Sequence, residues 1–228
     1  MTAVRSEHRL YLDIDRTLVD TDQTKARYIT ALAIFCHVPE KTVVDSLQLY
    51  VSSLDATTDF DPLGFAEALV RELPGSYSAK QLESVILRPE HFASAVYEDV
   101  QVLRNMGEEL PGLGLRMGIY SEGVKRWQEL KLLAGKINDI FAADLREIHR
   151  RKLAAEALTR LSAGSVIVDD KVEVVQTLAT KRPDLHPVWI NRASKEKSSI
   201  AGVETIHSLR ELPALLRKIW LGTQHVTE

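Results

Sequence analysis

Two aspartates, Asp13 and Asp15, follow an apolar stretch near the N-terminus and precede the hydroxyl of Thr17. Residues 10–14 are almost continuously apolar, which is typical of a strand buried on both faces of a sheet. Side chains two positions apart on an extended chain point the same way, so both carboxylates are expected where this strand reaches the surface. Two such charges at the rim of a core need compensation, and Mg²⁺, which prefers oxygen ligands, is the simplest source of it.

Two later apolar stretches also end in polar side chains. The stretch 115–120 ends in Ser121, and the stretch 165–168 ends in Asp169 and Asp170. A basic triplet, residues 150–152, lies between them. If the three strands are neighbours, one edge of the sheet collects four carboxylates, a hydroxyl and at least one cation, an arrangement suited to a metal and a phosphate dianion.

The elements that must position these residues alternate along the chain. Apolar stretches predict further strands at 186–190 and 203–206, with a possible edge strand at 137–143. Helical periodicity predicts helices at 93–110, 124–133, 153–161, 173–180 and 208–220. Strands separated by helices indicate an α/β fold with a doubly wound parallel sheet, which binds ligands at the carboxyl ends of its strands.

Between the first two strands, residues 22–92 have helical periodicity and no convincing strand. We expect this segment to be a separate small helical domain, with residues 1–21 and 93–228 forming the α/β core domain. The segment carries ten acidic and six basic residues, a net charge of about −4. That charge disfavours a polyanion, and a domain of this size suits a small organic phosphate.

Composition excludes several classes of protein. The 228 residues, 45% hydrophobic and 27% charged, predict a globular chain, and the net charge of −3 gives no support for nucleic-acid or anionic-membrane binding. The single cysteine, Cys36, excludes an intrachain disulfide and is interpreted as a core residue. No apolar run approaches the roughly 20 residues of a membrane span, and the N-terminus does not resemble a signal peptide, so a cytoplasmic location is expected.

Taken together, these motifs resemble those of the haloacid dehalogenase superfamily, most of whose members are Mg²⁺-dependent phosphatases. The family's first motif, Asp-x-Asp-x-Thr, is matched by Asp13, Asp15 and Thr17. Its second is a Ser or Thr, matched by Ser121, and its third is a Lys, matched best by Lys152. Its fourth is an acidic pair, matched by Asp169 and Asp170. The helical segment falls where the class I subgroup of the family carries its all-helical cap domain, and the α/β part corresponds to the family's Rossmann-like core.

The resemblance implies a mechanism. Asp13 would attack phosphorus and form an aspartyl-phosphate, while Asp15 would act as general acid and then general base. Mg²⁺ would be held by Asp13, the backbone carbonyl of Asp15, Asp169 and Asp170. Ser121 and Lys152 would bind phosphoryl oxygens. Further phosphate or substrate contacts are expected from the following residues: Arg16, Thr17, Glu122 and Gly123.

Several alternatives stay open at the level of sequence. Arg151 competes with Lys152 for the role of the cation. Asp15 favours phosphoryl transfer, because the family's dehalogenases and phosphonate hydrolases lack an Asp at this position. Hydrolysis of a small organic phosphate monoester is the favoured activity, a phosphomutase or phosphotransferase is the next, and a catalytically silent interaction protein is the third. The substrate and the oligomeric state are not readable from the sequence.

Overall fold

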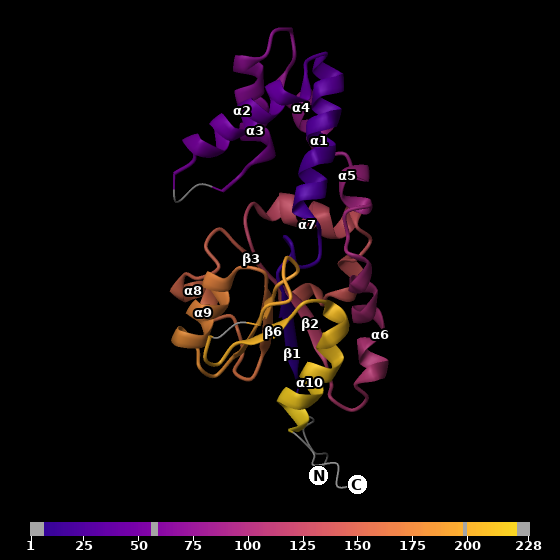
Figure 1. Cartoon of the computed structure of the whole chain (residues 1–228), viewed down its shortest axis with the longest axis vertical. Coiled ribbons are helices and arrows are strands. Elements are labelled where there is room, and N and C mark those ends of the chain that lie inside the picture. Colours follow the sequence, from indigo (N-terminus) through magenta and orange to yellow (C-terminus); the bar gives the residue numbers. More distant parts are fainter. Residues whose placement is uncertain (1–6, 56–58, 198–199, 223–228) are drawn as a thin grey trace.

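The computed structural model describes residues 7–55, 59–197 and 200–222, which contain a six-stranded sheet in the order β3-β2-β1-β4-β5-β6 (Figure 1). Every pair of neighbouring strands is parallel. The strands are β1 (Arg9–Leu12), β2 (Arg116–Glu122), β3 (Arg146–His149), β4 (Val166–Asp169), β5 (His186–Ile190) and β6 (Glu204–Ile206). The predicted α/β class with a parallel sheet is confirmed.

Ten helices occur among the described residues. They are α1 (Thr21–Cys36), α2 (Glu40–Ser53), α3 (Pro62–Glu72), α4 (Ala79–Ile86), α5 (Glu90–Ala93), α6 (Gln101–Glu109), α7 (Lys125–Ala134), α8 (Ala155–Leu158), α9 (Val172–Lys181) and α10 (Leu212–Leu221). Short 3-10 turns lie at 98–100, 138–140, 143–145 and 209–211. No described helix combines the length and the apolar character needed to cross a membrane.

The central strand, β1, is buried on both faces because its neighbours supply helices on both sides. Leu10 and Leu12 belong to one apolar core with residues of α6 and α10, whereas Tyr11 points to the opposite face, toward α8 and α9. This division follows from the alternation of side chains along a strand. Figure 1 shows α8 and α9 on one side of the sheet and α6 and α10 on the other.

Among the described residues between β1 and β2 the regular elements are all helices, and α1 to α4 share a hydrophobic core of their own. Side chains from α1 to α4, including Leu32, Phe65 and Leu82, pack together away from the sheet. Trp127 of α7 joins this cluster, so α7 lies between the sheet and the helical segment. Figure 1 shows α1 to α4 beyond α7 at one end of the molecule.

One predicted element at the sheet edge is wrong, and one strand there was not predicted. The apolar run 137–143 is not an edge strand, because Ile137 and Phe141 turn inward through 3-10 turns and join the main core. The edge strand is the following segment, β3, which pairs with β2 alone and has only partly buried side chains. The sequence did not predict β3 because its residues are mostly charged, and a strand at the edge of a sheet does not need a continuous apolar sequence.

The predicted helix over 93–110 is also wrong at its start, because α6 begins only at Gln101. Before it, Val96 forms an antiparallel bridge with Val19, and the Asp20 N–H donates to the Ala95 carbonyl at 2.7 Å. These bonds join the segment between β1 and α1 to the segment that follows α5. Similarly, α8 spans only four residues of the predicted helix over 153–161.

Candidate active site

The carboxyl ends of β1 and β4 bring three aspartates together. Leu12 lies opposite Val168 in the sheet, and the Asp13 N–H donates to the Val168 carbonyl at 2.9 Å, so Asp13 and Asp169 leave neighbouring strands at the same level. Oxygens of Asp13, Asp169 and Asp170 all lie within 4.8 Å of one another. Asp13 and Asp169 are buried and Asp170 is partly buried. The predicted meeting of the first and fourth motifs is therefore present.

Lys152 places a buried ammonium between two of these carboxylates. Its Nζ lies 2.8 Å from Asp13 Oδ1 and 2.5 Å from Asp169 Oδ2, and its side chain is 1% exposed. Two residues of β2 hold its backbone: the Tyr120 hydroxyl donates to the Lys152 carbonyl, and the Glu122 carboxylate accepts the Lys152 N–H at 3.1 Å. Arg151 is exposed, so Lys152 is the cation within this cluster.

The electrostatics of the cluster fit a divalent cation. Burial and the neighbouring charge of Asp13 raise the pKa of Asp169 to about 7 despite its contact with Lys152. The same two causes raise the pKa of Asp170 to about 6, and its buried Oδ1 accepts no hydrogen bond from a described residue. Three carboxylates and one ammonium leave two negative charges, which one divalent ion would balance. Carboxylate oxygens are the ligands that Mg²⁺ prefers.

Two hydroxyls near these strand ends have no hydrogen-bond partner among the residues that the structure describes. Thr17 Oγ1 and Ser121 Oγ are buried, and neither forms a hydrogen bond within the described part of the chain. A buried hydroxyl without a partner costs free energy, so such groups commonly serve a ligand. Gly123, two residues after Ser121, adopts a φ of 132° and donates its N–H to the His149 carbonyl at 2.9 Å. A side chain at Gly123 would be strained in this conformation.

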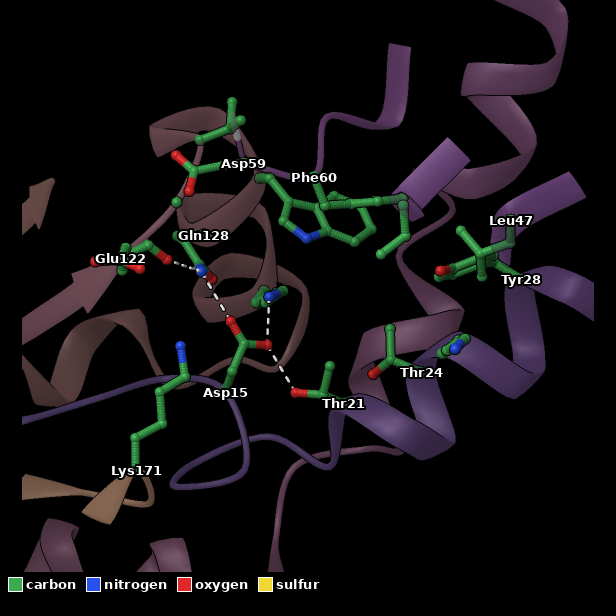
Figure 2. Close-up of a pocket in the computed structure, with 16 residues that line it drawn as sticks. Asp15, Thr21, Thr24, Tyr28, Leu47, Asp59, Phe60, Glu122, Gln128 and Lys171 are labelled. Atoms are coloured by element: carbon green, nitrogen blue, oxygen red, sulfur yellow. Dashed lines mark hydrogen bonds and ion pairs between the residues drawn. The ribbon is translucent and has the colours of Figure 1, made fainter. Parts of the chain in front are cut away.

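The Asp15 carboxylate lies apart from the three-aspartate cluster and is held by three donors from outside the motif (Figure 2). Thr21 Oγ1 and Lys131 Nζ lie 2.7 Å and 2.6 Å from Asp15 Oδ1, and Gln128 Nε2 lies 2.8 Å from Oδ2. Burial by itself would raise the pKa of Asp15, but the Lys131 ammonium and the donated hydrogen bonds outweigh it and lower the pKa to about 2. Asp15 is therefore a carboxylate over the neutral pH range.

Sequence reasoning missed Lys131 and Gln128. Both lie on the buried side of α7, where Lys131 is 3% and Gln128 is 2% exposed. Lys131 also sits over the Trp127 ring, 5.3 Å from its centroid. The available signal was a pair of polar residues spaced three apart beside Trp127 and Leu132, but helical periodicity does not say that this face meets Asp15.

Two predicted substrate contacts have other partners in the structure. Arg16 is exposed and forms an ion pair with Asp22 at 3.1 Å, at a cleft that Asp170 also lines. Glu122 is partly buried, and its carboxylate accepts the Lys152 N–H. The sequence predicts a phosphate or substrate contact for Glu122, whereas Glu122 lies at the end of β2 and positions Lys152.

A third residue that sequence reasoning missed is Arg192, which follows β5. Its guanidinium donates to the Thr17 carbonyl at 2.8 Å, forms an ion pair with Asp99 at 2.9 Å and lies over the Tyr97 ring at 3.9 Å. Asp99 also accepts hydrogen bonds from the Ser208 hydroxyl and the Leu209 N–H. Arg192 thereby ties the loop after β1 to the start of α6 and to the segment before α10.

A cavity of about 310 Å³ opens above Asp15, between the sheet edge and the helical segment. Its lining includes Glu122 and Lys171 from the sheet side, Tyr28 from α1, and Trp127 from α7. Lys171 donates its backbone N–H to Asp169 at 3.0 Å, so this cavity adjoins the aspartate cluster. A small ligand of this volume could contact both parts of the molecule.

The chain is similar in structure to solved haloacid dehalogenases and haloacid dehalogenase-like hydrolases. A haloacid dehalogenase-like hydrolase from Burkholderia xenovorans has a TM-score of 0.68 and 20% identity, over 93% of this chain and 98% of that chain. A magnesium-bound chain from Bacillus subtilis, assigned to the HAD-hydrolases, gives 0.61 and 15%, over 93% and 99%. A 2-haloacid dehalogenase from Pseudomonas syringae gives 0.62 and 15%, over 93% and 99%. No protein-family model and no curated protein sequence matches the chain significantly.

Proposed function

Since the chain has the fold of the haloacid dehalogenase superfamily, we propose that it is a Mg²⁺-dependent hydrolase of a small organic phosphate monoester. The observation that carries the proposal is the buried Asp13–Lys152–Asp169 arrangement beside Asp170. It combines a carboxylate nucleophile, a fixed cation and a divalent-metal donor set at one point. The unpartnered hydroxyls of Thr17 and Ser121 support a ligand with several acceptor oxygens.

In the first step, an Asp13 oxygen attacks phosphorus and the ester oxygen departs, leaving the phosphoryl group on Asp13. Lys152 offsets the charge of Asp13 and holds its orientation. Ser121 and Thr17 are placed to donate to phosphoryl oxygens, and Lys152 can donate to another. Asp13, Asp169 and Asp170, with the Asp15 carbonyl, would hold the metal, which would neutralise charge on the transferring group.

In the second step, water attacks phosphorus, the bond between phosphorus and the Asp13 oxygen breaks, and inorganic phosphate leaves, while a base removes a proton from the water. Asp15 suits this role because it is a carboxylate at neutral pH and lines the cavity. The same low pKa makes Asp15 a poor general acid for the first step. The proton for the leaving oxygen would then come from the adjacent Lys131 ammonium, 2.6 Å from Asp15, unless the leaving group departs as an anion.

A second candidate function is hydrolytic dehalogenation. Several of the similar structures are haloacid dehalogenases, one of them with chloropropionic acid covalently bound. The Lys131 ammonium beside Asp15 favours phosphate hydrolysis over this alternative, because it can donate a proton to the leaving oxygen, whereas displacement of a halide needs no proton at the leaving group. Both reactions use a carboxylate nucleophile, so they differ in the released product.

The test is an assay of the purified protein for phosphate release from an aryl phosphate and for halide release from a 2-haloacid, each with and without Mg²⁺. We expect phosphate release that requires Mg²⁺ and falls about a thousandfold or more in Asp13→Asn. Asp45→Asn, which makes the same change on an exposed side chain of α2 that does not line the cavity, serves as the matched control. Halide release without phosphate release would establish the second candidate, and undiminished turnover in Asp13→Asn would exclude Asp13 as the nucleophile.

A further inference from the structure

The cavity above Asp15 has two chemically different ends (Figure 2). At the sheet end are the Asp15 carboxylate, with its donors Gln128 and Lys131, and the side chain of Lys171. At the far end the lining comes from α1, α2 and the segment before α3, and it is largely apolar. None of the three clustered aspartates lines this cavity, which meets the cluster through Asp15 and Lys171, so a ligand with its phosphate at the cluster reaches the far end by passing Asp15.

Aromatic side chains form a continuous wall at the far end. The rings of Tyr28 and Phe60 are stacked with centroids 6.5 Å apart, and the rings of Phe60 and Trp127 are 6.0 Å apart. Phe92 packs edge-on against Trp127 at 5.1 Å and supports it from behind. Leu47 and Val51 complete the apolar lining. The faces and edges of such rings suit offset or edge contacts with another flat ring.

Three of the five polar side chains at the far end are committed to partners within the protein, whereas the Lys25 ammonium and the Tyr28 hydroxyl have no hydrogen bond or ion pair within the described part of the chain. The Thr24 hydroxyl donates to the Asp20 carbonyl at 3.0 Å, and Thr21 donates to Asp15. Asp59 is 13% exposed and forms an ion pair with Arg150 at 3.3 Å. A ligand rich in hydroxyls would lose its hydrogen bonds to water here and regain few, which disfavours polyhydroxylated substrates such as sugar phosphates.

From the aromatic wall and the committed polar groups we infer that the alcohol or phenol released from the substrate carries a flat aromatic ring, which lies against Phe60 and Trp127. This inference rests on the proposed function for the position of the phosphate. The volume of about 310 Å³ admits one or two rings beside a phosphate. The natural substrate class is thus a phosphate monoester of an aromatic alcohol or phenol.

Benzyl phosphate and cyclohexylmethyl phosphate provide a matched test, because both are esters of primary alcohols and differ only in the aromaticity of the ring. We expect the wild-type protein to hydrolyse benzyl phosphate with a kcat/KM about three- to tenfold higher. Equal values, or faster hydrolysis of the saturated ester or of a hexose phosphate, would overturn the inference while leaving phosphate hydrolysis intact.

The variant Phe60→Leu tests the wall itself, since it keeps an apolar side chain and removes the ring. Its benzyl-to-cyclohexylmethyl ratio is expected to fall to about one, whereas Phe35→Leu should keep the wild-type ratio. Phe35 is the control because it packs with Tyr77 in the same helical segment and does not line the cavity. A preference unchanged in Phe60→Leu would remove this wall as its source.

If the wild-type protein hydrolyses no phosphate ester, the proposed function fails and the cavity is tested by binding. Calorimetric titration with benzylphosphonate and cyclohexylmethylphosphonate, which cannot be hydrolysed, compares the same two rings. Tighter binding of the aromatic compound, lost in Phe60→Leu, would support an aromatic ligand. Binding of equal strength, or none of either compound, would overturn the inference.

Discussion

Replacing Lys131 with methionine is expected to change the protonation of Asp15. The methionine keeps an apolar stem of similar length and removes the ammonium that lies 2.6 Å from Asp15 Oδ1. Burial, which raises the pKa of this carboxyl, would then be opposed only by the hydrogen bonds from Gln128 and Thr21. The pKa of Asp15 should therefore rise from about 2 toward its ordinary value of 3.8.

The structure gives the size of the effect on stability. A pKa lowered from 3.8 to about 2 corresponds to roughly 2 kcal/mol, at about 1.36 kcal/mol per pH unit. Because the Asp15 side chain is 28% exposed, we expect about 1–2 kcal/mol in practice. This stabilisation is fully present above the unfolded pKa of 3.8 and is lost as the pH falls toward 2. Lys131→Met should be less stable near neutral pH, with a smaller deficit in acid.

The assay combines urea unfolding at about pH 7 and about pH 2.5 with a pH profile of kcat/KM for an aryl phosphate at saturating Mg²⁺. In the variant, the acidic limb of the profile should move to higher pH relative to wild type, because Asp15 protonates earlier. Lys125→Met is the matched control: it removes an exposed lysine from the same helix, where Lys125 pairs with Glu129 at 3.7 Å. Identical pH profiles and stabilities for the two variants would refute the assignment of Lys131 as the group that keeps Asp15 charged.

Two further predictions concern the metal site and the brace at Arg192. The pKa values of Asp169 and Asp170, raised to about 7 and about 6, mean that the metal-free protein loses stability as the pH rises from about 4 through 7. Mg²⁺ needs both carboxylates ionised, so it should raise the unfolding temperature by roughly 5 °C or more at about pH 7.5 and by much less at about pH 5. An equal rise at both pH values would contradict the assignment of Asp169 and Asp170 as metal ligands. Arg192→Met removes the ion pair of Asp99 and the hydrogen bond to the Thr17 carbonyl. We therefore expect about 3 kcal/mol of destabilisation in urea unfolding and a lower kcat. Wild-type values for both would show that Arg192 does not stabilise the loop at Thr17.

The parts of the fold that sequence reasoning could predict are those fixed by burial on both faces. β1, β4 and β5 are continuous apolar stretches, and the acids that close β1 and β4 were expected to meet because parallel strands end at one edge. The helical character of the segment between β1 and β2 followed from its periodicity. Whether residues 22–92 behave as a separate domain is still a proposal.

What could not be predicted depends on tertiary contacts. The edge strand β3 has a charged sequence, and the apolar run before it turns into the core instead of extending. Lys131 and Asp15 are 116 residues apart, and Arg192 and Thr17 are 175 apart, so no local pattern connects them. Helical periodicity places Lys131 on a face of α7 without saying that this face covers a carboxylate.

The central claim is that Asp13 carries the phosphoryl group during turnover. Rapid acid quenching of the wild-type protein with excess aryl phosphate and Mg²⁺, followed by mass spectrometry of its peptides, measures this directly. We predict that the peptide containing Asp13 gains the mass of one phosphoryl group, and that Asp13→Asn shows no such gain. Phosphate release at the wild-type rate with no modified peptide, or a phosphoryl group on a different residue, would contradict the account.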